Sequence, residues 1–168
     1  MALKKKNGKI LLSMPAAAQG IKGVAVIPLQ RIPDVRGTIM HGARRDTLLN
    51  PFGEVYFKKL YHGVINGWHV HETLFLNYIC IQGMMRLVLY DLRKSSPTFE
   101  KFQEICYGDD NYCMVHIPPG VANASESLVK PHSLMCNIAS EPHNPRVKYR
   151  RIDPLSGEIN FDWKRRNF

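Results

Sequence analysis

The stretch that decides the fold, residues 63–91, reads GVINGWHVHETLFLNYICIQGMMRLVLYD. Its second half predicts two strands, Phe75 to Gln82 and Met84 to Tyr90, joined by a glycine turn. Its first half carries His69 and His71, which project from one face of a strand because side chains alternate along it. Pairing of these strands would place two imidazoles at the mouth of a closed or sandwiched sheet, a common position for a small-molecule site. The sequence therefore predicts a β-barrel with a polar pocket.

Short β-forming runs separated by turn residues continue along the chain. Further strand candidates are Val24 to Leu29, Thr38 to His41, Glu54 to Tyr61, Phe99 to Tyr107, Tyr112 to Ile117 and Leu134 to Ala139. About ten such strands, with turn signals every eight to twelve residues, predict an all-β sandwich or barrel. One helical turn is expected near Asp46 to Leu49. We predict a loose N-terminal arm over residues 1–22 and a single domain over residues 23–168.

The composition excludes a disordered chain and weakens a nucleic-acid role. Hydrophobic residues make up 45% of the 168 residues and charged residues 22%, which are ordinary globular values. The net charge of +9 could indicate nucleic-acid binding. However, seven of the positive charges lie at the two ends and leave about +2 for the rest. These seven are Lys4, Lys5, Lys6, Lys9, Lys164, Arg165 and Arg166. We expect solvated tails and no nucleic-acid partner; tails that help to attract an anionic ligand stay an open alternative.

The cysteines and the N-terminus indicate the compartment. None of the four cysteines has the spacing of a zinc knuckle, so we interpret them as reduced core residues. They are Cys80, Cys106, Cys113 and Cys136. The basic N-terminus imitates a signal peptide, but its apolar run at Ile10 is shorter than a signal peptide requires. No segment is long and apolar enough to span a membrane. We therefore expect a cytoplasmic protein without a membrane partner.

Several motifs resemble those of a known family. They are Asp34-Val-Arg36-Gly37, Asn66-Gly67-Trp68-His69, Asp91-Leu-Arg93-Lys-Ser-Ser-Pro97-Thr-Phe99, Ile117-Pro118-Pro-Gly120-Val-Ala and Ile152-Asp153-Pro-Leu, with a closing Asp162-Trp163. Their order and spacing resemble those of the dTDP-4-dehydrorhamnose 3,5-epimerases over residues 34–163. The Gly67-Trp-His69-Val-His71 run also resembles the Gly-Phe-His-x-His strand of the nucleotide-sugar 3,4-ketoisomerases. The resemblance implies a single-domain cupin jelly roll and a homodimer that exchanges strands near the first motif.

The resemblance also implies a chemistry. Family enzymes remove a proton beside the 4-keto group of a nucleotide-linked deoxysugar, pass through an enolate and reprotonate the carbon from the opposite face. This reaction needs a base, an acid and a group that stabilises the enolate oxygen. His69 falls at the position of the family's base, for which imidazole suits near-neutral pH. Arg36 falls on a turn arginine that resembles a phosphate contact. No cofactor is implied.

Some family positions carry other residues here. Asn66 occupies the position of a family arginine, and Leu76 occupies that of the lysine that polarises the ketone. A family strand aspartate is replaced by Leu87, a family histidine by Asn123, and the tyrosine that acts as the acid by Leu134 or Met135. The chain also ends at Phe168, before the family's segment whose aspartate orients the base. Candidate replacements are His71 and Tyr78 as proton partners of His69, with Asn66, His116 and Asn123 as substrate contacts.

Three functional hypotheses follow. The leading one is a nucleotide-sugar epimerase or isomerase in deoxysugar or surface-polysaccharide biosynthesis, with His69, His71 and Tyr78 as catalytic residues. The second is a non-catalytic sugar- or nucleotide-binding cupin. The third is a metal-dependent oxygenase, because His69-x-His71 has the spacing of a cupin metal motif. That motif also requires a glutamate near Phe75 and a later histidine where Asn123 stands, and two imidazoles leave a metal short of ligands. We therefore expect no metal.

Overall fold

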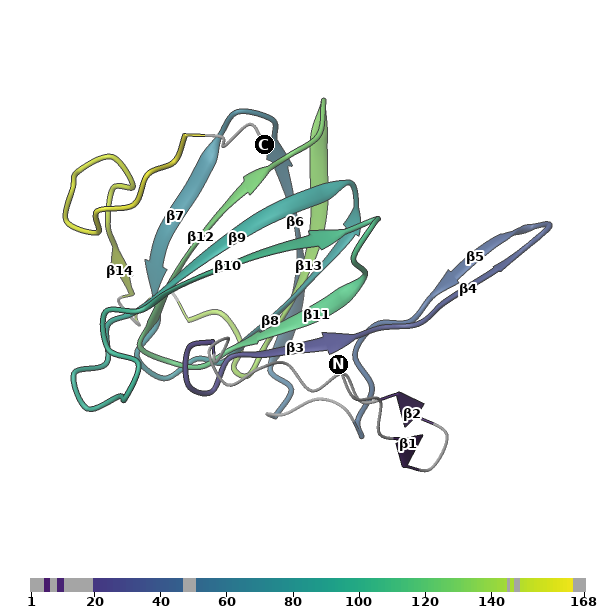
Figure 1. Ribbon diagram of the computed structural model, residues 1–168, viewed down its shortest axis with the longest axis horizontal. Helices are drawn as coiled ribbons and strands as arrows, with labels where there is room; N and C mark the ends of the chain where they lie inside the picture. Colours follow the sequence, from purple (N-terminus) through teal and green to yellow (C-terminus); the bar gives the residue numbers. More distant parts are fainter. Residues whose placement is uncertain are drawn as a thin grey trace.

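The computed structural model describes residues 5–6, 9–10, 20–46, 51–144, 146 and 149–164, and its regular elements there are all strands (Figure 1). In chain order they are β1 (Lys5–Lys6), β2 (Lys9–Ile10), β3 (Ala25–Pro28), β4 (Arg31–Asp34), β5 (Gly37–Met40), β6 (Glu54–Tyr61), β7 (Ile65–Val70), β8 (Leu76–Gln82), β9 (Met84–Asp91), β10 (Phe102–Gly108), β11 (Cys113–Ile117), β12 (Val121–Ser127), β13 (His132–Ala139) and β14 (Arg150–Arg151). This part of the chain contains no helix that could cross a bilayer.

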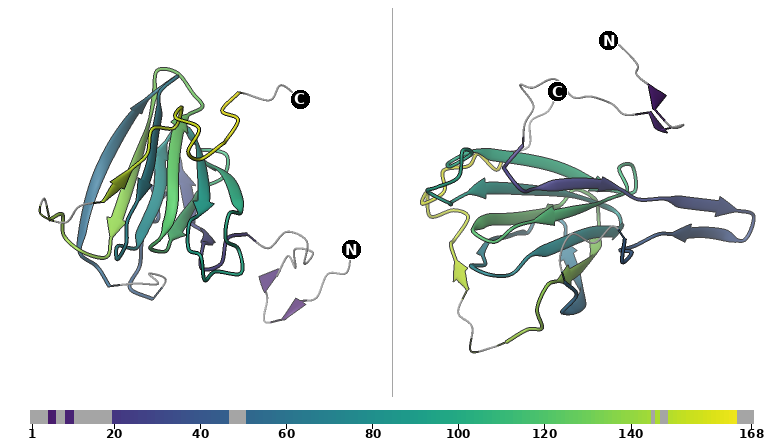
Figure 2. Two further views of the ribbon diagram at one scale, coloured as in Figure 1. Left: turned by 90° about the vertical axis from the view of Figure 1, so that its left-hand side faces the viewer. Right: turned by 90° about the horizontal axis from the view of Figure 1, so that it is seen from below.

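Two five-stranded antiparallel sheets face each other, as the turned views in Figure 2 show. One sheet has the order β10-β9-β12-β7-β14 and the other the order β3-β11-β8-β13-β6. The chain passes between the sheets several times, from β7 to β8, from β10 to β11 and from β12 to β13. This is the jelly-roll arrangement, so the predicted all-β fold class is confirmed.

Three apolar layers follow from side-chain alternation along the strands. The layer between the sheets includes Leu87, Tyr107 and Met135, all nearly inaccessible to solvent. A second layer lies on the outer face of the β7 sheet, where Trp68 is fully buried under the C-terminal segment. Its indole ring lies 5.5 Å from that of Trp163, measured between centroids. The third layer, around Ile79 and Cys136, lies on the outer face of the β8 sheet.

Three sequence expectations need correction. The sequence does not predict β12, because polar residues occupy its centre, yet the structure buries them. The strand predicted at Thr38 to His41 is present as β5, but it pairs with β4, which the sequence does not predict, in a hairpin that projects from the sandwich (Figure 1). Cys106 is exposed, whereas the other three cysteines are buried and all four are free. The predicted helical turn lies largely outside the described residues, as does most of the predicted arm over residues 1–22.

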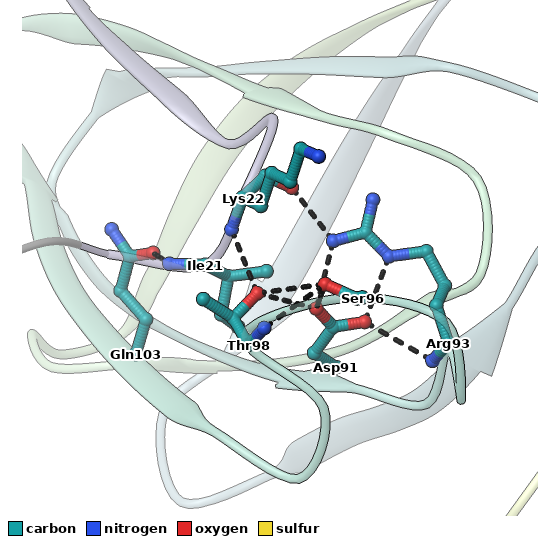
Figure 3. Close-up of polar contacts among 7 residues, drawn as sticks. All are labelled: Ile21, Lys22, Asp91, Arg93, Ser96, Thr98 and Gln103. Carbon is teal, nitrogen blue, oxygen red and sulfur yellow. Dashed lines mark hydrogen bonds and ion pairs between the residues drawn. The ribbon is translucent and has the colours of Figure 1, made fainter.

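The end of β9 and the segment that follows it form a polar network around a buried carboxylate (Figure 3). The carboxylate of Asp91, which has no exposed surface, accepts hydrogen bonds from the Arg93 guanidinium at 2.7 and 2.8 Å. It also accepts bonds from the hydroxyls of Ser96 at 2.7 Å and Thr98 at 2.6 Å. Arg93 and Thr98 in turn bind the backbone of Lys22. The network therefore fastens the chain just before β3.

Candidate functional site

Strand β7 presents His69 and His71 to one cavity between the ends of the two sheets. Gly67, two residues before His69, is packed tightly, because a side chain at this position would come within 2.2 Å of the Ala124 side chain on β12. Glycine at this position therefore allows the two backbones to approach closely. In the resulting register His69 lies directly opposite Asn123.

The cavity has a volume of about 550 Å³ and an unusually polar lining. Its lining residues come from four strands and the loop before β14: Glu54, Tyr56 and Lys58 on β6, Asn66, His69 and His71 on or after β7, Tyr78 on β8, Arg151 on β14, and His143 and Tyr149 from the loop. A volume of this size falls in the usual range for small-molecule sites. The site thus combines acid–base groups, cations and aromatic rings.

The His69 ring is neutral at neutral pH. Burial lowers its pKa from the ordinary value to about 4, and the positive charges of Lys58 and Arg151 add to this effect. The ring Nε2 lies 3.0 Å from the Asn66 side-chain nitrogen. Within the described chain, the other ring nitrogen, Nδ1, has no hydrogen-bond partner. Because the Asn66 nitrogen is a donor, Nε2 is the unprotonated nitrogen of the neutral ring and is the atom that can accept a proton, whereas Nδ1 carries the ring hydrogen.

Asn123 connects the two sheets behind the His69 ring. Its carboxamide oxygen accepts a 3.1 Å hydrogen bond from the Tyr78 hydroxyl, and its nitrogen donates to the His69 carbonyl at 3.0 Å. Asn123 is 2% exposed and Tyr78 is 6% exposed. Burial also raises the pKa of Tyr78 well above the ordinary phenol value. Tyr78 therefore lines the cavity, but its proton is already donated to Asn123.

His71 belongs to an aromatic and cationic stack on one wall of the cavity. Its ring lies nearly parallel to that of Tyr149, at an interplanar angle of 20° and a centroid distance of 5.0 Å. The Arg151 guanidinium lies 4.8 Å from the centroid of the same tyrosine and also hydrogen-bonds its hydroxyl. Burial lowers the pKa of His71. The stack places a fixed positive charge at the rim beside two neutral imidazoles.

Three of the residues singled out from the sequence do not line this cavity: Asn123, which is buried behind the His69 ring, His116 and Arg36. His116 projects from the outer face of the β8 sheet, where its Nδ1 lies 2.8 Å from the Asn77 side-chain oxygen. Arg36 lies in the turn of the projecting β4–β5 hairpin and is ion-paired with Asp34 at 2.7 Å. Neither His116 nor Arg36 is among the residues that line the His69 cavity.

The cavity does not provide a ligand set for a metal. Among the residues with described positions, no three histidine, cysteine, aspartate or glutamate side chains are grouped as a metal ion would require. His69 and His71 are the only pair with cupin metal spacing, and Phe75 and Asn123 occupy the positions where further ligands would lie. These residues do not fit a metal centre.

Six residues that line the cavity were not singled out from the sequence: Glu54, Tyr56, Lys58, His143, Tyr149 and Arg151. Three of them alternate along β6, and this period of two could have been recognised in the sequence. The other three belong to or precede β14, a two-residue strand that pairs with β7 about eighty positions earlier. No local signal predicts such a pairing.

Comparison with known proteins adds a family. A family model described as dTDP-4-dehydrorhamnose 3,5-epimerase matches residues 18–167. The spore coat polysaccharide biosynthesis protein SpsL of Bacillus subtilis strain 168 is 32% identical over 85% of this chain and 96% of its own. The probable low-salt glycan biosynthesis epimerase Agl13 of Haloferax volcanii is 27% identical over 84% of this chain and 89% of its own. A dTDP sugar isomerase from Desulfovibrio desulfuricans G20, known from its crystal structure, is 28% identical in sequence. Its structure matches with a TM-score of 0.81, and the match covers 85% of this chain and 92% of that one.

Proposed function

This chain belongs to the dTDP-4-dehydrorhamnose 3,5-epimerase family, and from that premise we propose that it epimerises or isomerises a nucleotide-linked 4-keto-6-deoxysugar. The relatives' names refer to polysaccharide and glycan biosynthesis, which supports a role in deoxysugar or surface-polysaccharide biosynthesis. The observation that carries the proposal is a neutral imidazole, His69, in a polar cavity that also contains two cations. A neutral imidazole is the form that accepts a proton.

In the proposed reaction His69 removes the proton from a carbon next to the ketone. The electron pair of the broken C–H bond forms a carbon–carbon double bond, and the carbonyl π electrons move to oxygen, which gives an enolate. Return of a proton to the opposite face of that carbon completes an epimerisation. The sequence suggests His71 or Tyr78 as the proton partner. The bond from Tyr78 to Asn123 engages the phenol proton and favours His71. Because the His71 ring is neutral, it first takes up a proton from water and then donates it to the carbon, and His69 gives up to water the proton that it removed.

The substrate contacts in this proposal follow from charge and position. Asn66 orients the base through its contact with Nε2, and Asn123 fixes the backbone behind it. Arg151 lies at the cavity wall on the Tyr149 ring and suits the diphosphate of a sugar nucleotide. Arg36 as a phosphate contact requires a second copy of the chain, because its hairpin projects away from the sandwich (Figure 1).

A homodimer is therefore part of the proposal. The outer face of the β8 sheet carries an apolar groove of about 870 Å³, lined by residues such as Val55, Phe57 and Ile81. The projecting hairpin also exposes apolar side chains, with Ile32 47% exposed and Ile39 62% exposed. Exposed apolar surfaces of this kind are typical of protein interfaces. The hairpin continues directly into the groove through Met40, which favours a second copy as the occupant. The free cysteines favour a cytoplasmic location.

The alternative is a sugar- or nucleotide-binding protein without catalysis, and one experiment separates the two. The protein is incubated with dTDP-4-keto-6-deoxyglucose in deuterium oxide, and deuterium at the carbons beside the ketone is followed by NMR. The enzyme hypothesis predicts incorporation by the wild type and its loss in His69→Ala. The matched control is His132→Gln, a histidine outside the cavity that packs edge-on against Tyr61. Binding of the sugar nucleotide without any exchange would favour the alternative.

A further inference from the structure

The proposed reaction requires a positive group at the ketone oxygen, and the position where a lysine is expected carries Leu76. The Leu76 side chain is 3% exposed and belongs to the apolar layer between the sheets. An aliphatic side chain cannot stabilise a developing negative charge. Among the described residues that line the cavity, two have side chains that are cationic at neutral pH, Lys58 and Arg151. The question is which of them can reach the reacting carbonyl.

Strand β6 directs Lys58 toward the base. Glu54, Tyr56 and Lys58 line the His69 cavity, whereas Val55 and Phe57 line the groove on the opposite face of the same sheet. Along the sheet Lys58 lies opposite Met135, which faces the interior and lies opposite Cys80 on β8. Lys58 thus projects into the sandwich from the edge strand, with the inner strands beside it.

Arg151 is less suited to this role. Its guanidinium lies over the Tyr149 ring and hydrogen-bonds the Tyr149 hydroxyl, so it is already engaged. The Arg151 residue is exposed, whereas Lys58 is half-buried. Lys58 also has no ion-pair partner among the described residues, although Glu54 lies on the same strand and lines the same cavity. A half-buried ammonium without a carboxylate is costly for stability and suits a site that receives a negative charge.

We propose that the Lys58 side chain stabilises the enolate oxygen. Lys58 lies on β6, whereas Leu76, at the position where a lysine is expected, lies on β8. This inference rests on the proposed function and names a further catalytic residue for it. The Lys58 ammonium donates a charge-assisted hydrogen bond to the ketone oxygen and strengthens it as negative charge develops. No proton leaves the lysine in this step, because the proton taken from carbon resides on His69.

The charge state of Lys58 provides a readout that a structural role would not share. Burial lowers the pKa of Lys58 to about 8, and the positive charge of Arg151 contributes to the decrease. The other titratable or charged groups around the cavity are Glu54, Tyr56, His69, His71, Tyr78, His143, Tyr149 and Arg151. Activity that depends on the ammonium should decrease as the pH rises through about 8. An arginine at this position stays charged and should remove that decrease.

The test measures solvent-deuterium exchange into dTDP-4-keto-6-deoxyglucose for the wild type and four variants at several pH values. Lys58→Met should reduce the exchange rate by about 100-fold, the usual effect of removing one such donor. Lys58→Arg should retain measurable exchange without the decrease near pH 8. The matched control is Lys59→Met, because Lys59 is the next residue on β6 and is exposed; it should match the wild type. Lys58→Gln is measured in parallel, so that the test does not depend on the folding of one variant.

The outcomes separate this inference from the function on which it rests. If Lys58→Met and Lys58→Gln exchange deuterium at rates within threefold of the Lys59→Met rate, Lys58 does not have the proposed role. The epimerase proposal would remain intact in that case. A high-pH decrease that persists in Lys58→Arg would also overturn it. Absence of exchange in the wild type would instead contradict the proposed function itself, and the inference with it.

Discussion

The buried Asp91 carboxylate should contribute far more stability than an exposed aspartate of the same local geometry. In both Asp91-Leu-Arg93 and Asp34-Val-Arg36 the carboxylate accepts hydrogen bonds from the backbone and guanidinium of the arginine two residues later. The Asp91 side chain has no exposed surface, whereas that of Asp34 is 42% exposed. The two aspartates therefore have the same spacing to their arginine partners. They differ in burial and in the further hydrogen bonds that Asp91 accepts from Ser96 and Thr98.

The expected loss can be estimated for Asp91→Asn, which keeps the volume and removes the charge. Loss of one partner of a buried ion pair costs about 3–5 kcal/mol. The lower end applies because the Arg93 side chain is 25% exposed and regains water. A loss of about 3 kcal/mol corresponds to a decrease in melting temperature of about 6–12 °C for a domain of this size.

The assay is thermal and urea unfolding of the wild type, Asp91→Asn and Asp34→Asn at pH 7. Asp34→Asn should leave the unfolding midpoint unchanged, since exposed ion pairs contribute little. A decrease for Asp91→Asn of less than about 3 °C, which corresponds to about 1 kcal/mol or less, would refute the reasoning. Equal decreases for the two variants would refute it as well, because burial would then have no effect.

Three further predictions follow from the same contacts. Burial alone would raise the pKa of Asp91, but hydrogen bonds from Arg93, Thr98 and Ser96 outweigh it and lower the pKa below the unfolded value of about 3.9. The wild type should therefore lose stability as the pH falls below about 4. The decrease in the urea midpoint over this pH range should be smaller in Asp91→Asn, which has no carboxylate to protonate. The same dependence of the midpoint on pH in both proteins would contradict this prediction. Asn66→Asp should raise the pKa of His69 from about 4, because a carboxylate beside Nε2 stabilises the imidazolium; an unchanged histidine titration by NMR would exclude it. Phe57→Glu should give a monomer in light scattering, whereas Tyr61→Glu, on the same strand outside the groove, should remain a dimer; a dimeric Phe57→Glu would argue against the groove as the interface.

Local patterns were sufficient for much of the fold and for one part of the site. Alternation along β7 predicts that His69 and His71 share a face, and turn residues predict most of the strands. Strand β12 could not be predicted, because Asn123, Ser125 and Glu126 read as polar loop residues until the sandwich buries them. Burial of such residues depends on partners that are distant in the sequence.

The remaining site residues depend on pairings that the sequence does not encode locally. Lys58 lies in a predicted strand, but both faces of β6 carry large side chains, so alternation alone does not say which face is internal. Tyr149 and Arg151 reach the cavity through the pairing of β14 with β7. Asp91, the last residue of β9, is buried and accepts hydrogen bonds from Arg93 and Thr98, which in turn bind the Lys22 backbone (Figure 3). The sequence after Asp91 gives no local sign of this contact with the chain before β3.

The claim that a neutral His69 removes the proton is tested most directly by the pH dependence of kcat/KM for solvent-deuterium exchange. This parameter reports the pKa of the base in the free enzyme. Because the pKa of His69 is lowered to about 4, the account predicts a constant kcat/KM between pH 5.5 and pH 7. An increase of about tenfold per pH unit from pH 5 towards 6.5 would require a base with an ordinary imidazole pKa, and would contradict the account.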